Sequence, residues 1–176
     1  MRSEGIMKLI KPDLSVERLT EIMMPYWYDK GVRCVLIDLD NTISPWRKSY
    51  ITEDAYAMIA DCRAIGITVV LFTNANAQRA CEAAWKAGIN YYAKANKPFP
   101  FVYRKAISEL GFHARQVMTI GDQIFTDVLG GNLAGCVTVL TAPLSEVEFS
   151  GTRLLRFLEK WLAGRKLIFR ERYPES

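Results

Sequence analysis

The sequence contains a single histidine, His113, and no pair of cysteines at the Cys-x-x-Cys spacing. One histidine, predicted in a loop, cannot form a histidine-rich metal site. The four cysteines, Cys34, Cys62, Cys81 and Cys136, are scattered along 176 residues. Cys34 and Cys136 lie within or at the edge of apolar runs and are predicted to be small buried side chains. This pattern favours a reducing compartment over a disulfide framework.

Long hydrophobic runs are also absent. No apolar stretch approaches the roughly 20 residues that span a bilayer, and the N-terminal segment, with Glu4, has no hydrophobic signal core. We therefore predict a soluble, cytoplasmic protein that contacts membranes at most peripherally. The net charge of +4 permits phosphate-bearing partners but falls short of a nucleic-acid-binding signature, so no specific nucleic-acid binding is predicted.

The composition is that of an ordinary globular protein, with 50% hydrophobic and 24% charged residues. A chain of this length buries roughly two-thirds of its unfolded surface, and it contains no repeat or linker. We predict one domain over residues 1–176. Residues 1–30 are predicted to hold a helix and an aromatic segment, and residues 150–176 a basic amphipathic helix and a tail.

Buried apolar runs alternate with helical segments along the chain. The pattern predicts strands at 33–39, 67–72, 89–93, 117–120 and 137–140. It predicts helices at 13–24, 52–65, 77–87, 101–110, 126–134 and 152–162, with the aromatic residues at 24–28 ending the first of them. Such alternation at short intervals favours an α/β fold with a parallel five-stranded sheet and helices on both faces.

The first of these strands runs directly into the string Asp38-Leu39-Asp40-Asn41-Thr42. Residues two apart on an extended backbone share a face, so Asp38 and Asp40 are predicted to project into the same volume. Two close carboxylates call for a cation, a shared proton or a reaction. The alternative is a turn in which the Asp and Asn side chains cap backbone groups.

Polar side chains follow the later strands in the same way. These are Thr73 and Asn74 after the second strand, Lys97 after the third, and Asp122, with Asp127 one turn on, after the fourth. Each could be a helix cap or a solvated surface residue. In a parallel sheet, however, the carboxyl ends of the strands lie on one edge, so all of these residues can converge on a site.

The order of these motifs resembles the haloacid dehalogenase-like (HAD) superfamily of phosphohydrolases. The string at 38–42 and two others are similar to the YqeG-type subfamily (subfamily IIIA): Lys94-Ala95-Asn96-Lys97-Pro98 and the residues at 121–132, which begin Gly-Asp-Gln. The resemblance covers most of the chain. It implies a HAD-like Rossmannoid three-layer sandwich.

The resemblance also implies catalytic roles. Asp38 would be the nucleophile that forms an aspartyl-phosphate, and Asp40 the general acid and base. Mg²⁺ would be held by Asp38, Asp122 and the backbone carbonyl of Asp40.

The remaining motif residues would contact the substrate or support those that do. Thr73 and Lys97 would hold the phosphoryl oxygens, with Thr42 and Asn74 also binding substrate. Asp127 would orient Lys97 or support the metal.

The short spacings between motifs leave no room for a cap domain. Thr42 and Thr73 are separated by 30 residues, and Thr73 and Lys97 by 23, which one helix and one strand use up in each case. An uncapped site is open to large substrates. The predicted substrate is therefore a phosphate on a lipid headgroup, a macromolecule or a small molecule.

The predicted last helix carries apolar residues at helical spacing, surrounded by basic residues: Leu154, Leu155, Leu158, Trp161 and Leu162, with Arg153, Arg156, Lys160, Arg165 and Lys166. It either packs on the sheet or rests on anionic lipid. Eukaryotic relatives of the YqeG type include mitochondrial phosphatidylglycerophosphate phosphatases. That relation makes phosphatidylglycerophosphate the leading candidate substrate.

Two other classes of protein fit these motifs less well than a phosphatase does. A dehalogenase has no need of Asp40. A response-regulator receiver has its motifs in another chain order, because here Lys97 precedes the last acidic motif. The alternative that stays open is a catalytically weak HAD-fold binding module or scaffold associated with ribosomes or GTPases, although every catalytic position is filled.

Overall fold

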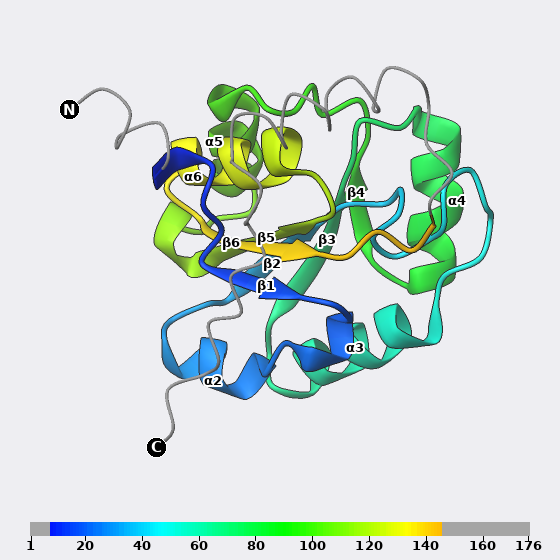
Figure 1. Cartoon of the computed structure of the whole chain (residues 1–176), viewed down its shortest axis with the longest axis horizontal. Coiled ribbons are helices and arrows are strands. Elements are labelled where there is room, and N and C mark those ends of the chain that lie inside the picture. Colours follow the sequence, from blue (N-terminus) through cyan, green and yellow to red (C-terminus); the bar gives the residue numbers. More distant parts are fainter. Residues whose placement is uncertain (1–7, 146–176) are drawn as a thin grey trace.

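A parallel six-stranded sheet forms the centre of the structure, a computed structural model that describes residues 8–145 (Figure 1). The strand order is β1-β6-β5-β2-β3-β4, and every neighbouring pair is parallel. The strands are β1 (Leu14–Val16), β2 (Cys34–Ile37), β3 (Thr68–Phe72), β4 (Asn90–Tyr92), β5 (Val117–Gly121) and β6 (Val137–Thr141). The central strands β2 and β5 are buried along their whole length, as expected of a sheet covered on both faces.

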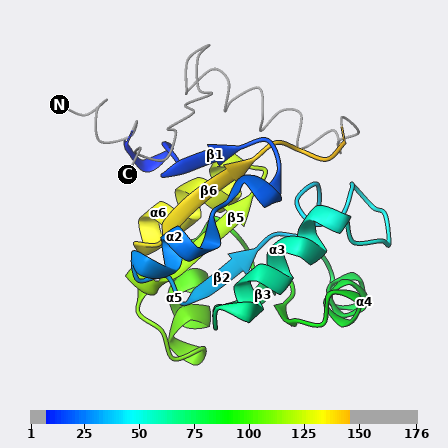
Figure 2. The same ribbon diagram turned by 90° about the horizontal axis from the view of Figure 1, so that it is seen from below.

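Helices cover both faces of this sheet. In Figure 1, α2 (Met24–Asp29) and α3 (Glu53–Ala64) lie below it, and α5 (Pro100–Glu109) and α6 (Leu129–Ala134) lie above it. Figure 2, seen from below, shows α2 and α3 across the near face. The helix α4 (Ala77–Ala87) contributes apolar residues to the same core as α3. Among residues 8–145, no helix is both long and apolar enough to cross a bilayer.

Alternate residues of β2 divide the core into two layers. Val35 and Ile37 pack with residues of α3 and α4, whereas Cys34 and Leu36 pack with Tyr103 of α5 and its neighbours. This division follows from the period of two along a strand. The predicted α/β three-layer sandwich is confirmed, with six strands instead of five.

Most predicted elements match the structure, including their end signals. The Thr52 side chain accepts a hydrogen bond from the backbone N–H of Ala55 (3.3 Å) and so caps α3. Gly88 ends α4 in the left-handed conformation at φ +66°, which glycine adopts without steric cost.

The prediction of a helix over 13–24 is wrong. This segment forms the edge strand β1, then a 3₁₀ turn at Leu19–Glu21, and the helix α2 begins only at Met24. The Asp13 carboxylate accepts a hydrogen bond from the backbone N–H of Thr138 (2.8 Å), which holds the start of β1 beside β6. Pro25 stands at the first turn of α2, where proline is tolerated.

The predicted helix over 126–134 has two parts. A wide π-helical turn at Ile124–Val128 comes first, and α6 follows it. A second 3₁₀ turn, Ala114–Gln116, precedes β5. The predicted C-terminal helix over 152–162 and its basic surface lie outside the described residues.

Candidate active site

Three adjacent strands bring the acidic motifs together at one edge of the sheet. β2 lies between β5 and β3, and Ile37 at the end of β2 is in register with Ile120 and Leu71. Their carboxyl ends are therefore level. Asp38 and Asp122, which follow β2 and β5, lie at the same edge and are both buried.

Lys97 is buried between two carboxylates at this edge. Its Nζ lies 2.7 Å from Asp38 Oδ1 and 2.5 Å from Asp127 Oδ1, and only 3% of its side chain is exposed. Burial lowers the pKa of Lys97, but the charges of Asp127 and Asp38 outweigh it and raise that pKa above its usual value. The lysine is therefore held in its charged form between the two acids.

The loop that carries Lys97 is fixed by Asn74. The Asn74 side chain accepts a hydrogen bond from the Lys97 backbone N–H (2.9 Å) and donates one to the Lys97 carbonyl (3.3 Å). Both polar groups of the amide are thus engaged with the backbone of one residue, so Asn74 positions the lysine. Its predicted contact with substrate stays a prediction.

Asp127 reaches the site because of the wide turn after β5 and the glycine at its end. Its Oδ2 accepts hydrogen bonds from the Thr126 hydroxyl (3.1 Å) and the Gln123 backbone N–H (3.3 Å). A Cβ atom at Gly121 would lie 2.1 Å from Asp127 Cγ, closer than real contacts allow. The glycine of the Gly-Asp motif therefore makes room for the second aspartate.

Three buried carboxylates form a group that could hold a metal ion. Oxygen atoms of Asp38, Asp122 and Asp127 all lie within 4.8 Å of one another. Burial raises the pKa of Asp38 to about 6; the Lys97 charge opposes this rise, and the charges of Asp127 and Asp40 add to it. Hard oxygen donors at this spacing fit Mg²⁺. Two of the three predicted metal ligands, Asp38 and Asp122, lie in this group.

The side chain of the third, Asp40, lies outside the acidic group and pairs with an arginine. Arg79 Nη1 donates to Asp40 Oδ2 (3.0 Å) and Arg79 Nη2 to Asp40 Oδ1 (2.6 Å). The prediction for Asp40 as a ligand concerned its backbone carbonyl and stays a prediction. Arg79 was assigned no role from the sequence. Its place in the first turn after a strand end that carries site residues is the signal that could have revealed it.

Two threonine hydroxyls complete the predicted set. Thr73 Oγ1 accepts a hydrogen bond from the Ala75 backbone N–H (3.1 Å), which leaves its own hydrogen free to donate. The Thr42 hydroxyl is buried and makes no hydrogen bond within residues 8–145. Both are suited to donate to a phosphoryl oxygen, and that role stays a prediction.

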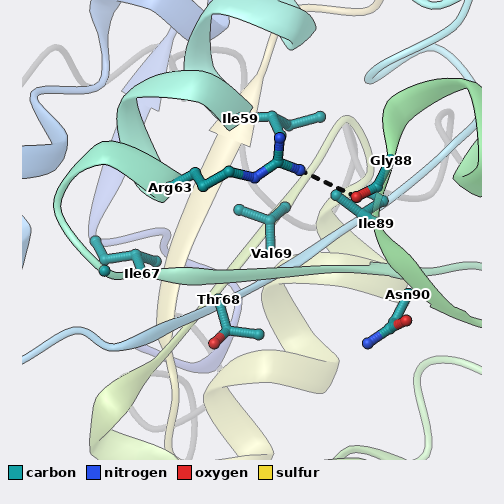
Figure 3. A pocket seen from close by; sticks show the side chains of 9 residues that line it. Ile59, Arg63, Ile67, Thr68, Val69, Gly88, Ile89 and Asn90 are labelled. Atoms are coloured by element: carbon teal, nitrogen blue, oxygen red, sulfur yellow. Dashed lines mark hydrogen bonds between the residues drawn. The ribbon is translucent and has the colours of Figure 1, made fainter.

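A pocket of about 340 Å³ lies at the other edge of the sheet, where β3 and β4 begin (Figure 3). Apolar residues line much of it, including Ile59, Ile67 and Val69. Arg63 spans it and donates a hydrogen bond to the Gly88 carbonyl (3.0 Å). None of the site residues Asp38, Lys97, Asp122 and Asp127 contributes to its lining.

Known proteins resemble this chain in both sequence and fold. A family model described as HAD-hydrolase-like matches residues 94–143, the segment that carries Lys97, Asp122 and Asp127. The probable phosphatase YqeG of Bacillus subtilis (strain 168) is 29% identical over 87% of this chain and 89% of its own length. These matches support the assignment of the chain to the HAD superfamily, as a phosphatase of the YqeG type.

More distant proteins agree with this assignment. A phosphatidylglycerophosphate phosphatase of Arabidopsis thaliana is 28% identical over 80% of this HAD phosphatase and 43% of the plant protein. A phosphoglycolate phosphatase of Neisseria gonorrhoeae is 27% identical over 77% of this chain and 60% of its own length.

Solved structures share the fold of this HAD phosphatase. An uncharacterized protein from Listeria monocytogenes superposes with a TM-score of 0.56 and 12% identity, over 67% of this chain and 85% of its own. A deoxy-D-mannose-octulosonate 8-phosphate phosphatase from Haemophilus influenzae, solved in a cobalt-bound form, superposes with a TM-score of 0.52 and 16% identity. The superposition covers 64% of this chain and 69% of that chain.

Proposed function

We propose that this HAD phosphatase is a Mg²⁺-dependent phosphomonoester hydrolase that works through an aspartyl-phosphate on Asp38. The observation that carries the proposal is the arrangement around Asp38. One of its oxygens lies 2.7 Å from the Lys97 ammonium, and its carboxylate lies within 4.8 Å of the oxygens of Asp122 and Asp127. A buried carboxylate beside a fixed cation and a cluster of metal-type ligands is suited to attack an anionic phosphate.

In the first step, an oxygen of Asp38 forms a bond to phosphorus as the bond from phosphorus to the ester oxygen breaks. Lys97 donates hydrogen bonds to the phosphoryl oxygens while negative charge spreads over them. The hydroxyls of Thr42 and Thr73 donate to the same oxygens. Asp40 gives its proton to the leaving alcohol oxygen.

In the second step, water attacks the phosphorus of the aspartyl-phosphate. Asp40 takes a proton from this water, and the bond between phosphorus and Asp38 breaks. Inorganic phosphate leaves, and both aspartates return to their starting forms. The same side chain thus serves first as acid and then as base.

Asp38 and Asp122, with the backbone carbonyl of Asp40, are the residues that would hold Mg²⁺. When bound, the ion supplies positive charge that offsets the repulsion between the Asp38 carboxylate and the phosphate. Asp127 would position Lys97, which it contacts directly.

Phosphatidylglycerophosphate is the leading candidate substrate. The named substrate of the plant relative is this lipid, and that of the Neisseria relative is phosphoglycolate. Both are phosphomonoesters with a second anionic group. The described chain between β2 and β4 forms only α3, β3, α4 and their loops, so no inserted domain covers the site and a headgroup at a lipid surface could reach it. We propose a cytoplasmic enzyme that contacts anionic membranes peripherally.

Hydrolysis of an aryl phosphate and of phosphatidylglycerophosphate in vesicles tests the proposal. Wild-type protein is expected to release phosphate only with Mg²⁺, and the Asp38→Asn variant to be inactive. Asp54→Asn is the control, because Asp54 pairs with Arg18 at 2.6 Å outside the site. If wild type and Asp38→Asn are equally inert on aryl, protein and lipid phosphates, the chain is a binding module and the proposal is wrong.

A further inference from the structure

Arg79 lies beside the acidic site, with its guanidinium held by Asp40. The two residues share a pair of parallel hydrogen bonds of 3.0 and 2.6 Å, and 30% of the arginine side chain is exposed, against 13% for the aspartate. The guanidinium therefore contacts both the half-buried acid and the solvent. Among the motif-derived roles of the proposed function, none uses this arginine.

The position of Arg79 is fixed by the start of α4. The Asn76 side chain caps this helix by accepting a hydrogen bond from the Arg79 backbone N–H (3.0 Å). The helix follows the loop in which Asn74 holds Lys97. The backbones of the arginine and of the buried lysine are thus anchored by the same short segment, on the same side of the sheet edge.

The pairing with Asp40 places Arg79 beside the leaving group. Both Asp40 oxygens are engaged by the guanidinium, so an Asp40 oxygen that turns to the ester oxygen must open at least one of these bonds. The guanidinium then has donors to spare and faces the substituent that the ester oxygen carries. Its planar pair of N–H groups matches a carboxylate or a phosphate and has no comparable match in a neutral alcohol.

We infer that Arg79 binds a second anionic group on the alcohol part of the substrate and so selects phosphomonoesters that carry one. This inference rests on the proposed function, because that function assigns Asp40 to the leaving oxygen. The ligand chemistry is a carboxylate or a phosphodiester a few bonds from the phosphomonoester. Arg79 is thus a specificity residue. Its guanidinium gives up a hydrogen bond to Asp40 and donates to the substrate anion instead.

Binding of two phosphonates of matched shape tests the inference without turnover. 3-Phosphonopropionate ends in a carboxylate where propylphosphonate ends in a methyl group. With Mg²⁺ present, calorimetry is expected to show wild-type protein binding the carboxylate about 10- to 100-fold more tightly, as for a charge-assisted hydrogen bond. Arg79→Met should remove this preference, and Arg79→Lys should keep only part of it, since lysine lacks the paired donors.

Two further variants test whether the preference depends on Arg79 and its partner Asp40. Asp40→Asn releases Arg79 from its charged partner and is expected to widen the preference for the carboxylate. Arg63→Met removes an arginine from the opposite edge of the sheet, where it bonds the Gly88 carbonyl, and should leave the preference as in wild type. Equal binding of the two phosphonates by wild type, or a preference that survives Arg79→Met, would overturn the inference.

Hydrolysis separates this inference from the proposed function and identifies the source of the anion. Arg79→Met should lower kcat/KM for either phosphoglycolate or phosphatidylglycerophosphate vesicles. This loss should be at least about 10-fold larger than the loss of kcat/KM for ethyl phosphate, which carries no second anion. Loss on the first indicates a small carboxylate, and loss on the second a lipid phosphodiester. An equal loss on all three substrates would show that Arg79 only positions Asp40. A binding preference without hydrolysis of any substrate would support the anion site and refute the phosphatase.

Discussion

The two edges of the sheet differ in the side chains that they bury. At the carboxyl edge, Asp38, Lys97, Asp122 and Asp127 are all withdrawn from solvent. At the amino edge, the pocket is lined by both apolar and polar residues and by no carboxylate, and its arginine, Arg63, donates to a backbone carbonyl.

Under the proposed function, the carboxyl edge is where the molecule gives up stability for chemistry. Buried charges are expensive to desolvate, and clustered carboxylates repel one another. A fold selected for packing alone would not gather three aspartates within 4.8 Å. Substitutions at the carboxyl edge should therefore change activity strongly, whereas those at the amino edge should change stability at most.

The largest expected effect is that of Asp38→Asn. The amide cannot form the aspartyl-phosphate, so kcat for an aryl phosphate should fall by about 10⁴-fold or more. The amide keeps the shape and can still accept a hydrogen bond from Lys97, so the free energy of unfolding should change by less than about 1 kcal/mol. Steady-state kinetics and urea denaturation check the two expectations. A large loss of stability with little loss of activity would contradict the view that the carboxyl edge serves activity more than stability.

Lys97→Met should damage both properties. It leaves the Asp38 and Asp127 carboxylates without their cation, and breaking a buried pair destabilises by about 3–5 kcal/mol. A divalent cation that binds the acidic group would stabilise the folded state, so we expect Mg²⁺ to recover part of this loss. Denaturation with EDTA and with Mg²⁺ measures the recovery. Equal stability in the two conditions would argue against a metal site in the acidic group.

A pair of glycine substitutions separates steric from conformational effects. Gly121→Ala brings a Cβ to 2.1 Å from Asp127 Cγ, and such overpacking costs about 1–3 kcal/mol and should also displace the aspartate and reduce activity. Gly66→Ala, at φ +81° with nothing within 4 Å of the added Cβ, is expected to cost about 1 kcal/mol through backbone strain alone. Thermal unfolding and kcat/KM are measured for both variants. They decide whether a loss of activity depends on the substitution lying at the carboxyl edge or only on the loss of stability.

Arg63→Met should have a smaller effect. Arg63 has an exposed hydrogen bond to the Gly88 carbonyl, and such a bond contributes about 0.5–1.5 kcal/mol. The value of kcat/KM for an aryl phosphate should stay within twofold of wild type, since the side chain lies at the opposite edge. A loss of activity as large as that of a carboxyl-edge variant would link the amino-edge pocket to the reaction.

The smallest expected effect is a difference in reactivity between the buried thiols and the exposed one. Burial raises the pKa of Cys34 and Cys136 to about 12, and that of Cys62 to about 12 with a further contribution from Asp61. At pH 8 only the exposed Cys81 should react quickly with iodoacetamide, and a Cys81→Ser variant should take up no label.

These shifts have a defined sign. The folded pKa lies above the unfolded value of 9.0, so the thiols stabilise the fold fully below pH 9, and this stabilisation is lost as the pH rises toward 12. Denaturation of wild type across that range measures it. Stability that increases from pH 9 to 12 would contradict the assignment of Cys34, Cys62 and Cys136 as buried neutral thiols.

The sequence predicted most of the sheet because its central strands have local signatures. β2, β3, β5 and β6 are strands of four or five mostly apolar residues, and helices with side-chain caps follow β2 and β3. The edge strand β1 has only three residues, and it forms because Leu14 pairs with Val139. A pairing across so long a stretch of chain leaves no periodicity, so the segment was predicted as helix.

The convergence of the site also followed from the sequence, whereas its pairings did not. Polar residues after successive parallel strands must share an edge, which brought Asp38, Lys97 and Asp122 together in the prediction. The partner of Asp40 depends on how far the Arg79 side chain reaches from α4, a contact between residues 39 apart. The hydrogen bond from the Lys97 backbone N–H to the Asn74 side chain likewise depends on loop geometry.

The measurement that tests the central claim most directly is the location of a trapped phosphoryl group. Wild-type protein would be mixed with an aryl phosphate and Mg²⁺, quenched in acid during turnover, digested and analysed by mass spectrometry. The predicted result is a phosphoryl group on the peptide that contains Asp38, dependent on Mg²⁺ and missing from Asp38→Asn. Turnover in the Asp38→Asn variant, or a phosphoryl group on a different residue, would contradict the account.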